Sequence, residues 1–271
     1  MCYSKEVQLI TACVILLSCL FYYCLYSARF ANSPKKWLKP FLNNVLLGFF
    51  CIGMHQFFEF LTLVTNNQII YKIGLIISIS SAYFLLRSLE ALTNRDVRSK
   101  IALWVVAAAA IYLFVIPVNF EAFSFYLRHE SVFVWAALWL LLFIYWHVCA
   151  FKVMAELKDD KSKKGVVVYL LSVADISFIL SAIYVLWGYF QFSVNVCYDS
   201  PSIWCTFFAI QAFFIPFFLS ALPSMFKRPF NHTRQSWKKT LVYILISLVL
   251  LALLILTLPF FKCLTWKFVF S

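Results

Sequence analysis

A chain of 271 residues that is 64% hydrophobic and only 13% charged is too apolar for a soluble globular domain. Its formal charge of +12 would favour nucleic-acid binding in a soluble protein. Because the basic residues lie between long apolar segments, we attribute the charge to membrane topology and expect no nucleic-acid partner. The composition predicts an all-α, polytopic transmembrane helical bundle that forms one domain over residues 1–271.

Eight apolar segments follow one another along the chain, and each is about as long as a helix that crosses a bilayer. They are Gln8–Ser27, Phe41–Val64, Ile69–Leu92, Ile101–Val118, Val132–Phe151, Val166–Phe190, Pro201–Leu222 and Leu241–Phe261. Because the connections between them are mostly short, successive helices are expected to be antiparallel neighbours.

Lysine and arginine residues gather in alternate connections, which sets the expected orientation. These connections are residues 28–40, 94–100, 152–164 and 227–239. By the positive-inside rule they face the cytoplasm, and an even number of spans then places both termini outside. The basic residues near the N-terminus follow the first apolar segment, so we interpret this segment as an uncleaved span.

The second segment carries a stripe of small or polar residues through an otherwise apolar helix. The stripe recurs at steps of three and four and consists of Asn44, Gly48, Cys51, His55, Glu59, Thr62 and Asn66. A carboxylate in hydrocarbon is costly unless it is paired, protonated or solvated. The stripe is therefore predicted to face protein or a water-filled cavity, with His55 and Glu59 in the outer half of the span.

Three other charged residues lie within predicted spans. Arg87 and Glu90 stand at i and i+3 near the inner end of the third segment, where they can neutralise each other. Asp175 lies in the sixth segment at a depth similar to that of Arg87, so we expect Arg87 to be its partner. We interpret these contacts as structural ion pairs, and we interpret His147, beside Trp146, as an interfacial anchor.

Three short motifs occur in order along the chain: Met1-Cys2-Tyr3-Ser4, Gln56-Phe57-Phe58-Glu59, and Ser202-Ile203-Trp204-Cys205-Thr206-Phe207-Phe208-Ala209. With them the chain resembles a family of uncharacterised bacterial multi-pass membrane proteins. That family begins Met-Cys-Phe-Ser, carries Gln-x-x-Glu-Gly in an early span and has Leu-Trp-Cys-Phe-Phe-Ala late; Phe60 stands where the family has glycine. The resemblance implies a bacterial inner (plasma) membrane protein and groups five residues: Cys2, Gln56, Glu59, Trp204 and Cys205.

The predicted topology brings much the same residues to the outer side of the bundle. An outward-facing polar pocket around His55, Gln56 and Glu59, joined by Cys205 and Cys2, would suit a small or lipid-like ligand. The first hypothesis is therefore a membrane protein that binds or senses such a molecule. The alternative is that Gln56 and Glu59 only join neighbouring helices through hydrogen bonds.

A second hypothesis is a metal-dependent intramembrane enzyme. Because the first hypothesis needs no catalysis, whether the protein is an enzyme stays open. His55 and Glu59 stand at i and i+4, so both could reach one metal ion, and Cys51 lies one turn earlier. A further ligand would come from Cys2, Cys205 or His129. A metal is thus the possible cofactor. A retinal Schiff base is not expected, because the last span has no mid-span lysine.

Two further hypotheses stay open. A proton-coupled transporter would use Glu59, Arg87 and Asp175 as a relay across the membrane. The other is thiol chemistry by Cys2 and Cys205. The alternative to thiol chemistry is that these cysteines take part in a structural disulfide. The cysteines that could form that disulfide are Cys2, Cys197, Cys205 and Cys263.

Overall fold

The computed structural model describes six main parts of the chain. They are residues 5–30, 36–93, 99–115, 130–157, 160–191 and, between 207 and 221, all but residues 209, 213 and 220. The chain divides into two compact units, Met1–Lys227 and Arg228–Ser271, and the second unit lies outside the described residues. Within the first unit, every regular element that is described is an α-helix, which confirms the predicted all-α class.

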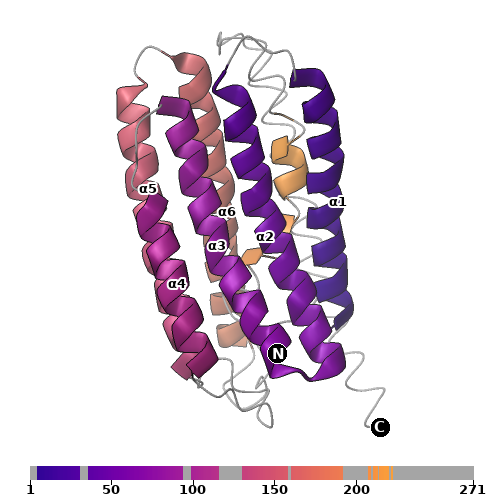
Figure 1. The fold of residues 1–271 in the computed structure, drawn as a ribbon. Helices are drawn as coiled ribbons and strands as arrows, with labels where there is room; N and C mark the ends of the chain where they lie inside the picture. The colour runs from indigo at the N-terminus through magenta and orange to yellow at the C-terminus, as the bar shows by residue number, and fades with distance from the viewer. Residues whose placement is uncertain are drawn as a thin grey trace. The chain divides into compact units, whose positions relative to one another are not determined.

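Six long helices follow one another (Figure 1): α1 Lys5–Phe30, α2 Leu38–Thr65, α3 Gln68–Thr93, α4 Ser99–Val115, α5 Glu130–Glu156 and α6 Lys161–Gln191. A shorter apolar helix, Ile210–Leu219, comes after them. Five of these helices (α1, α2, α3, α5 and α6) contain stretches long and apolar enough to cross a membrane. The predicted span Leu241–Phe261 lies outside the described residues.

The helices α2 and α3 form a tight antiparallel hairpin whose turn is made by two asparagines. Asn66 adopts the left-handed conformation (φ 52°, ψ 38°), and its N–H donates to the carbonyl of Thr62 at 2.8 Å. Asparagine tolerates this conformation better than most residues. The Asn67 Oδ1 then accepts the N–H of Ile69 at 2.8 Å and so caps α3. The turn sets α3 directly against α2, which is the most extensive helix contact described.

Glycine allows α1 to approach α2 closely. A Cβ atom at Gly53 would lie 2.9 Å from Leu16 Cδ2 and 3.0 Å from Ile15 Cγ2, both on α1. Any side chain at this position would make Leu16 and Ile15 shift, so glycine gives the closest approach of the two helices. On the same helix, the Tyr26 hydroxyl donates to the carbonyl of Leu219 and joins α1 to the helix Ile210–Leu219.

Tryptophan residues fasten α5 to α3. Trp135 Nε1 donates to Ser78 Oγ at 2.9 Å and to the carbonyl of Leu75 at 3.1 Å. Trp139 Nε1 lies 3.3 Å from the carbonyl of Ser78. A buried indole N–H needs an acceptor, and here the backbone of a neighbouring helix provides it. These bonds fix which face of α5 turns inward.

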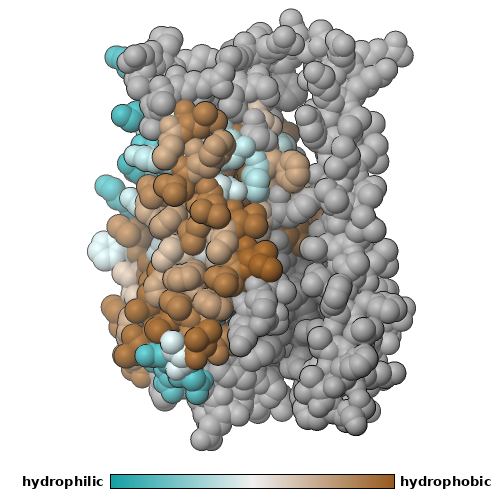
Figure 2. All heavy atoms as spheres, turned by 90° about the vertical axis from the view of Figure 1, so that its right-hand side faces the viewer, coloured by the Kyte–Doolittle hydropathy of each residue, from teal (hydrophilic) through white to brown (hydrophobic). Residues whose placement is uncertain are grey.

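The outward faces of the helices are apolar. Large hydrophobic side chains of α1 are exposed, among them Ile10, Leu17 and Phe21, and Trp104 of α4 is 74% exposed. Figure 2, which shows the face beside α1, has hydrophobic colour over most of its described part and hydrophilic residues toward the ends. A bundle that is apolar outside as well as inside is suited to a lipid surround rather than to water.

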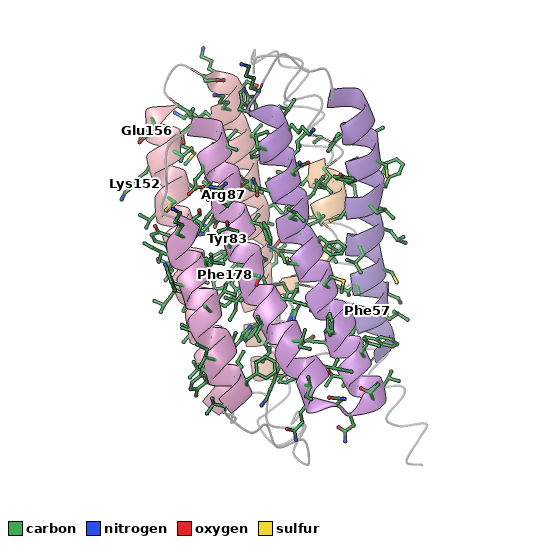
Figure 3. All side chains as sticks on the ribbon, in the orientation of Figure 1. Phe57, Tyr83, Arg87, Lys152, Glu156 and Phe178 are labelled. Atoms are coloured by element: carbon green, nitrogen blue, oxygen red, sulfur yellow. The ribbon has the colours of Figure 1, made fainter. Side chains whose placement is uncertain are left out.

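Charged residues gather toward one end of the bundle. Figure 3 shows Arg87, Lys152 and Glu156 in its upper part and Phe57 in its lower part. Glu90, near Arg87, accepts the N–H of Ser99 at 3.0 Å and so satisfies a donor at the start of α4. The polar residues of α2 around Phe57 therefore lie away from this charged end.

Candidate binding site around Glu59

The C-terminal third of α2 turns three polar side chains into the protein. His55, Gln56 and Glu59 are 1%, 0% and 6% exposed. Thr62, one turn further along the predicted stripe, is also buried. Cys51, the residue of the stripe one turn before His55, is only partly buried. The ionisable part of the stripe thus faces protein, as the cost of exposing a carboxylate to lipid requires.

Glu59 receives hydrogen bonds from two glutamine side chains. Gln8 Nε2, on α1, donates to Glu59 Oε2 at 2.7 Å, and Gln56 Nε2 lies 3.5 Å from the same oxygen. Gln56 was predicted from the sequence to belong to the site, and Gln8 was not. Gln8 could have been found from its position, because it places an amide side chain at the start of the first apolar segment. Such a side chain needs a hydrogen-bond partner wherever it is buried.

The third neighbour of Glu59 is His55, whose ring is oriented by α3. His55 Nδ1 lies 3.0 Å from the carbonyl of Gly74, and a carbonyl can only accept, so Nδ1 carries a hydrogen and donates it. The other ring nitrogen, Nε2, lies 3.5 Å from Glu59 Oε1. A Cβ at Gly74 would lie 2.9 Å from the Cβ of Phe58. Glycine therefore permits the approach that orients His55.

This orientation leaves Nε2 as the ring nitrogen that faces Glu59. Because His55 Nδ1 holds one hydrogen, the position between Nε2 and Glu59 holds at most one more. With that proton the pair has no net charge, either as a neutral imidazole and a carboxylic acid or as an imidazolium and a carboxylate. A pair without net charge costs less in a buried site than a lone carboxylate does.

Two amide oxygens beside Glu59 lack donors. Gln8 and Gln56 turn their NH₂ groups toward the carboxyl, and the Oε1 atoms of both are buried without a hydrogen-bond partner. An unpaired buried acceptor costs about 1–3 kcal/mol. The cluster therefore offers two free acceptors next to one carboxyl group, an arrangement that a ligand with hydrogen-bond donors would complete.

Aromatic rings border the cluster. The centroid of the His55 ring lies 5.8 Å from that of Trp135 on α5 and 5.1 Å from that of Phe208. Phe208 belongs to the late motif of the sequence analysis, so the structure brings one residue of that motif to His55. The predicted site residues Cys2, Trp204 and Cys205 lie outside the described residues, as do Cys197, Cys263 and His129.

The predicted metal-ligand trio is not assembled. In the part of the chain that the structure describes, no three His, Cys, Asp or Glu side chains are grouped closely enough to hold a metal ion. Cys51 is thus not grouped with His55 and Glu59 in this structure. A residue one turn earlier on the same helix shares a face with its neighbour, but its short side chain does not reach their polar atoms.

A second histidine–carboxylate pair lies toward the charged end. His147 Nε2, on α5, lies 2.7 Å from Asp175 Oδ1 on α6. The prediction that Arg87 is the partner of Asp175 was therefore wrong. Arg87, half exposed, lies 2.6 Å from Glu90, in the expected i, i+3 pair. The reason lies in the packing: α5 contacts both α3 and α6, and it supplies the partner of Asp175 from the adjacent helix.

These features indicate the class to which the protein belongs, although no related protein was found. No protein-family model, curated protein or solved structure matches the chain. The class is an α-helical membrane-protein bundle whose described part has five helices suited to crossing a bilayer and a polar cluster buried among them.

Proposed function

We propose that this protein is a multi-pass membrane protein that binds or senses a small or lipid-like molecule at the polar cluster of Gln8, His55, Gln56 and Glu59. The observation that carries the proposal is the pair of buried glutamine oxygens without donors, beside a carboxyl group. A structural cluster whose only role is to join helices gains stability by pairing every buried polar atom. The two unpaired acceptors favour a ligand instead.

The chemistry of the cluster defines the ligand. Two amide oxygens and a carboxyl oxygen recognise hydrogen-bond donors, so the polar part of the ligand carries hydroxyl or amine groups. Trp135 and Phe208 lie close to the His55 ring, and their faces suit an apolar body. A Glu59 carboxylate beside a neutral His55 would pair with an ammonium group, and a Glu59 carboxylic acid would pair with a neutral hydroxyl group.

The topology that accompanies this proposal has eight spans, both termini outside the cytoplasm and a position in the bacterial inner membrane. The bias of basic residues and the resemblance of the three motifs support it. In this orientation the cluster lies in the outer half of the bundle, and Cys2, Trp204 and Cys205 would lie on its outer side. Membrane lipid is then the surround of the protein and one possible source of the ligand.

Co-purification tests the proposal. The protein and its Glu59→Gln variant are purified in parallel from membranes, and small molecules and lipids retained by each are identified by mass spectrometry. The matched control is Glu156→Gln, the same chemical change at an exposed residue near the other end of the bundle. We expect a compound retained by the wild type and the control to be lost from Glu59→Gln. Identical retention by all three proteins would reject the proposal.

A specific observation favours proton-coupled transport as a second candidate. His147 repeats the arrangement of His55: its Nδ1 lies 2.8 Å from the carbonyl of Phe143, and its Nε2 faces the carboxyl of Asp175. Two such pairs, in different helices, could each hold a transferable proton. His147 would then take the place that the sequence analysis gave to Arg87 in a relay with Glu59 and Asp175.

Proteoliposomes distinguish this candidate from simple binding. With a pH-sensitive dye inside, a proton-coupled transporter changes the internal pH when a substrate gradient is applied. Glu59→Gln and Asp175→Asn should each abolish the change, and Glu156→Gln should not. Flux that persists in both variants would exclude the two carboxyl groups as proton carriers.

A further inference from the structure

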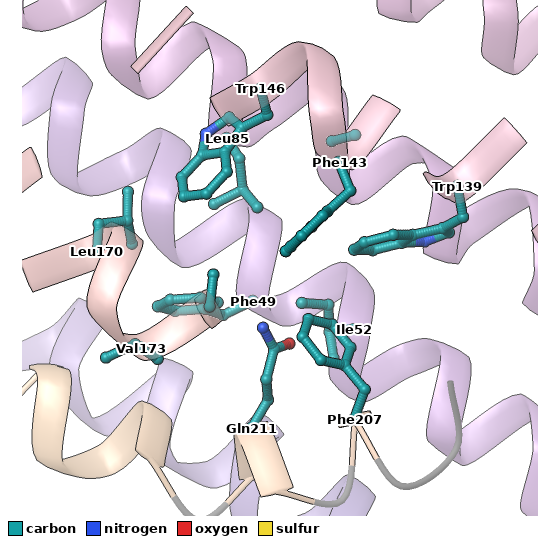
Figure 4. A pocket seen from close by; sticks show the side chains of 12 residues that line it. Phe49, Ile52, Leu85, Trp139, Phe143, Trp146, Leu170, Val173, Phe207 and Gln211 are labelled. Atoms are coloured by element: carbon teal, nitrogen blue, oxygen red, sulfur yellow. The ribbon is translucent and has the colours of Figure 1, made fainter. Parts of the chain in front are cut away.

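A cavity inside the bundle is small and apolar. Its volume is about 30 Å³, and aromatic and aliphatic side chains such as Phe49, Phe143 and Leu170 form most of its wall (Figure 4). A volume of this size holds roughly one or two groups as large as a water molecule. A larger second ligand therefore needs a surface of the protein, and the charged end of the bundle provides one.

Four exposed lysines form a basic surface where α2 and α6 begin. We call it the α2–α6 lysine surface, and its members are Lys36, Lys39, Lys161 and Lys164. Glu59 lies in the last third of α2, far along the helix from its start. The surface is therefore separate from the cluster to which the proposed function belongs.

Lys163 of α6 holds the starts of the two helices together. Its ammonium group lies 5.1 Å from the centre of the Trp37 ring, which directly precedes α2. It also donates to the carbonyl of Leu92, near the end of α3, at 2.9 Å. Each lysine of the surface stands within two positions of Trp37 or of Lys163 in the chain. The contact between these two residues therefore brings both pairs of lysines to one corner of the bundle.

Little acidic charge balances this corner. Within the described residues 36–42 and 160–164, Asp160 is the one acidic residue. Its Oδ1 accepts the N–H of Lys163 at 3.1 Å, and its Oδ2 lies 3.7 Å from the Lys163 ammonium. Asp160 thus caps α6 and pairs with the less exposed Lys163. The charge of the four exposed lysines is not balanced within these two helix starts.

The corner also lies at the boundary between polar and apolar surface. On α6, Val168 follows Lys164 by one turn and is 45% exposed. On α2, Leu47 follows Lys39 by about two turns and is 44% exposed. Tryptophan is enriched where acyl chains meet headgroups, and Trp37 stands at this level. A lipid whose chains lie along these apolar faces would therefore place its headgroup beside the lysines.

We propose that the α2–α6 lysine surface binds the headgroup of an acidic phospholipid. Lysine clusters at the ends of membrane helices, and basic sites between such helices, attract acidic headgroups. The attraction acts over about 8 Å at physiological salt, so the lysines need not all contact one phosphate group. The bias of basic residues toward this end accounts for its overall charge, and the contact of Trp37 with Lys163 adds one defined corner. The proposal does not depend on the ligand at Glu59.

Fluorescence anisotropy tests the proposal on the full chain in a non-ionic detergent. The probes are phosphatidylglycerol, whose headgroup is acidic, and phosphatidylcholine, whose headgroup has no net charge, each labelled on an acyl chain. We expect the wild type to bind phosphatidylglycerol more tightly. The variant Lys39→Gln/Lys164→Gln should bind it about 25-fold more weakly, because each lysine near an acidic membrane surface contributes a factor of about five. Its affinity for phosphatidylcholine should not change.

A matched double variant shows whether the corner itself matters. Lys100→Gln/Lys152→Gln removes two exposed lysines at the start of α4 and near the end of α5. The loss of charge is the same, and we expect the affinity for phosphatidylglycerol to stay at the wild-type value. Equal affinity of the wild type for both lipids, or an equal loss in the two double variants, would overturn the proposal.

Two measurements on the wild type need no substitution. At about 1 M sodium chloride the screening length falls to about 3 Å, so the preference for phosphatidylglycerol should disappear. A preference that persists would contradict the proposal. Sodium phosphate should displace phosphatidylglycerol no better than sodium chloride of the same ionic strength. Stronger displacement by phosphate would indicate a site for the free ion and would also overturn the proposal.

Discussion

Gln8 of α1 donates a hydrogen bond of 2.7 Å to Glu59 of α2, although the two residues stand 51 positions apart in the chain. The bond joins two helices that also approach closely at Gly53. The donor on the same helix as Glu59, Gln56 Nε2, lies farther away, at 3.5 Å. The shorter hydrogen bond to the buried Glu59 carboxyl thus comes from a neighbouring helix.

Substitution of Gln8 should show how Glu59 is held. Gln8→Leu removes the donor and is expected to destabilise the protein by about 1 kcal/mol, the usual scale of interhelical hydrogen bonds in membranes. Gln8→Glu sets a second carboxyl against Glu59 and should destabilise it more. Unfolding in detergent with increasing denaturant measures both. Equal stability of Gln8→Leu, Gln8→Glu and the wild type would show that the bond contributes nothing.

The contact between Gly74 and Phe58 predicts a rescue. Gly74→Ala places a Cβ near the Cβ of Phe58, pushes α3 away from His55, and should cost about 1–3 kcal/mol of stability. Phe58→Gly removes the Cβ that the new methyl group would meet. The double variant should therefore be more stable than the sum of the two single effects predicts. Strict additivity, measured by the same unfolding method, would place the strain elsewhere.

A double-mutant cycle tests the corrected partner of Asp175. Because His147 lies 2.7 Å from Asp175, His147→Phe and Asp175→Asn should couple by about 0.6–1.7 kcal/mol. The cycle with Arg87→Gln in place of His147→Phe should be additive, since Arg87 pairs with Glu90. Coupling to Arg87 without coupling to His147 would restore the pairing expected from the sequence.

The sequence predicted the helices well and their partners poorly, for a physical reason. The length and apolar character of a segment identify a membrane helix, so α2 and α6 were expected within a few residues of their observed bounds. The high cost of a carboxylate in lipid also predicted that Glu59 turns inward. These predictions rest on single segments, where burial in lipid leaves few alternatives.

Which helices meet is not determined by a single segment. Asp175 was given Arg87 as its partner because their depths agree, yet depth alone does not say which helix lies beside α6. Gln8 was overlooked because its position at the start of a span is compatible with the membrane surface. The close approach of α1 to α2 at Gly53 and the packing of α5 against α6 decide these neighbours, and their effect appears only in three dimensions.

The proposed orientation predicts which connections are accessible from outside. A cysteine introduced at Asn66, in the turn between α2 and α3, should react with a membrane-impermeant maleimide on intact cells. A cysteine at Lys161, at the start of α6, should react only after the membrane is permeabilised. Labelling is compared with that of the wild type, whose own cysteines set the background. The opposite pattern would invert the topology and place the Glu59 cluster on the cytoplasmic side.

The central claim is that the unpaired oxygens of Gln8 and Gln56 belong to a ligand site. The most direct test is an experimental density map of the protein purified from its native membrane. We predict non-protein density within hydrogen-bond distance of one or both oxygens and of the Glu59 carboxyl. Protein groups that donate to both oxygens, with no further density beside Glu59, would contradict it.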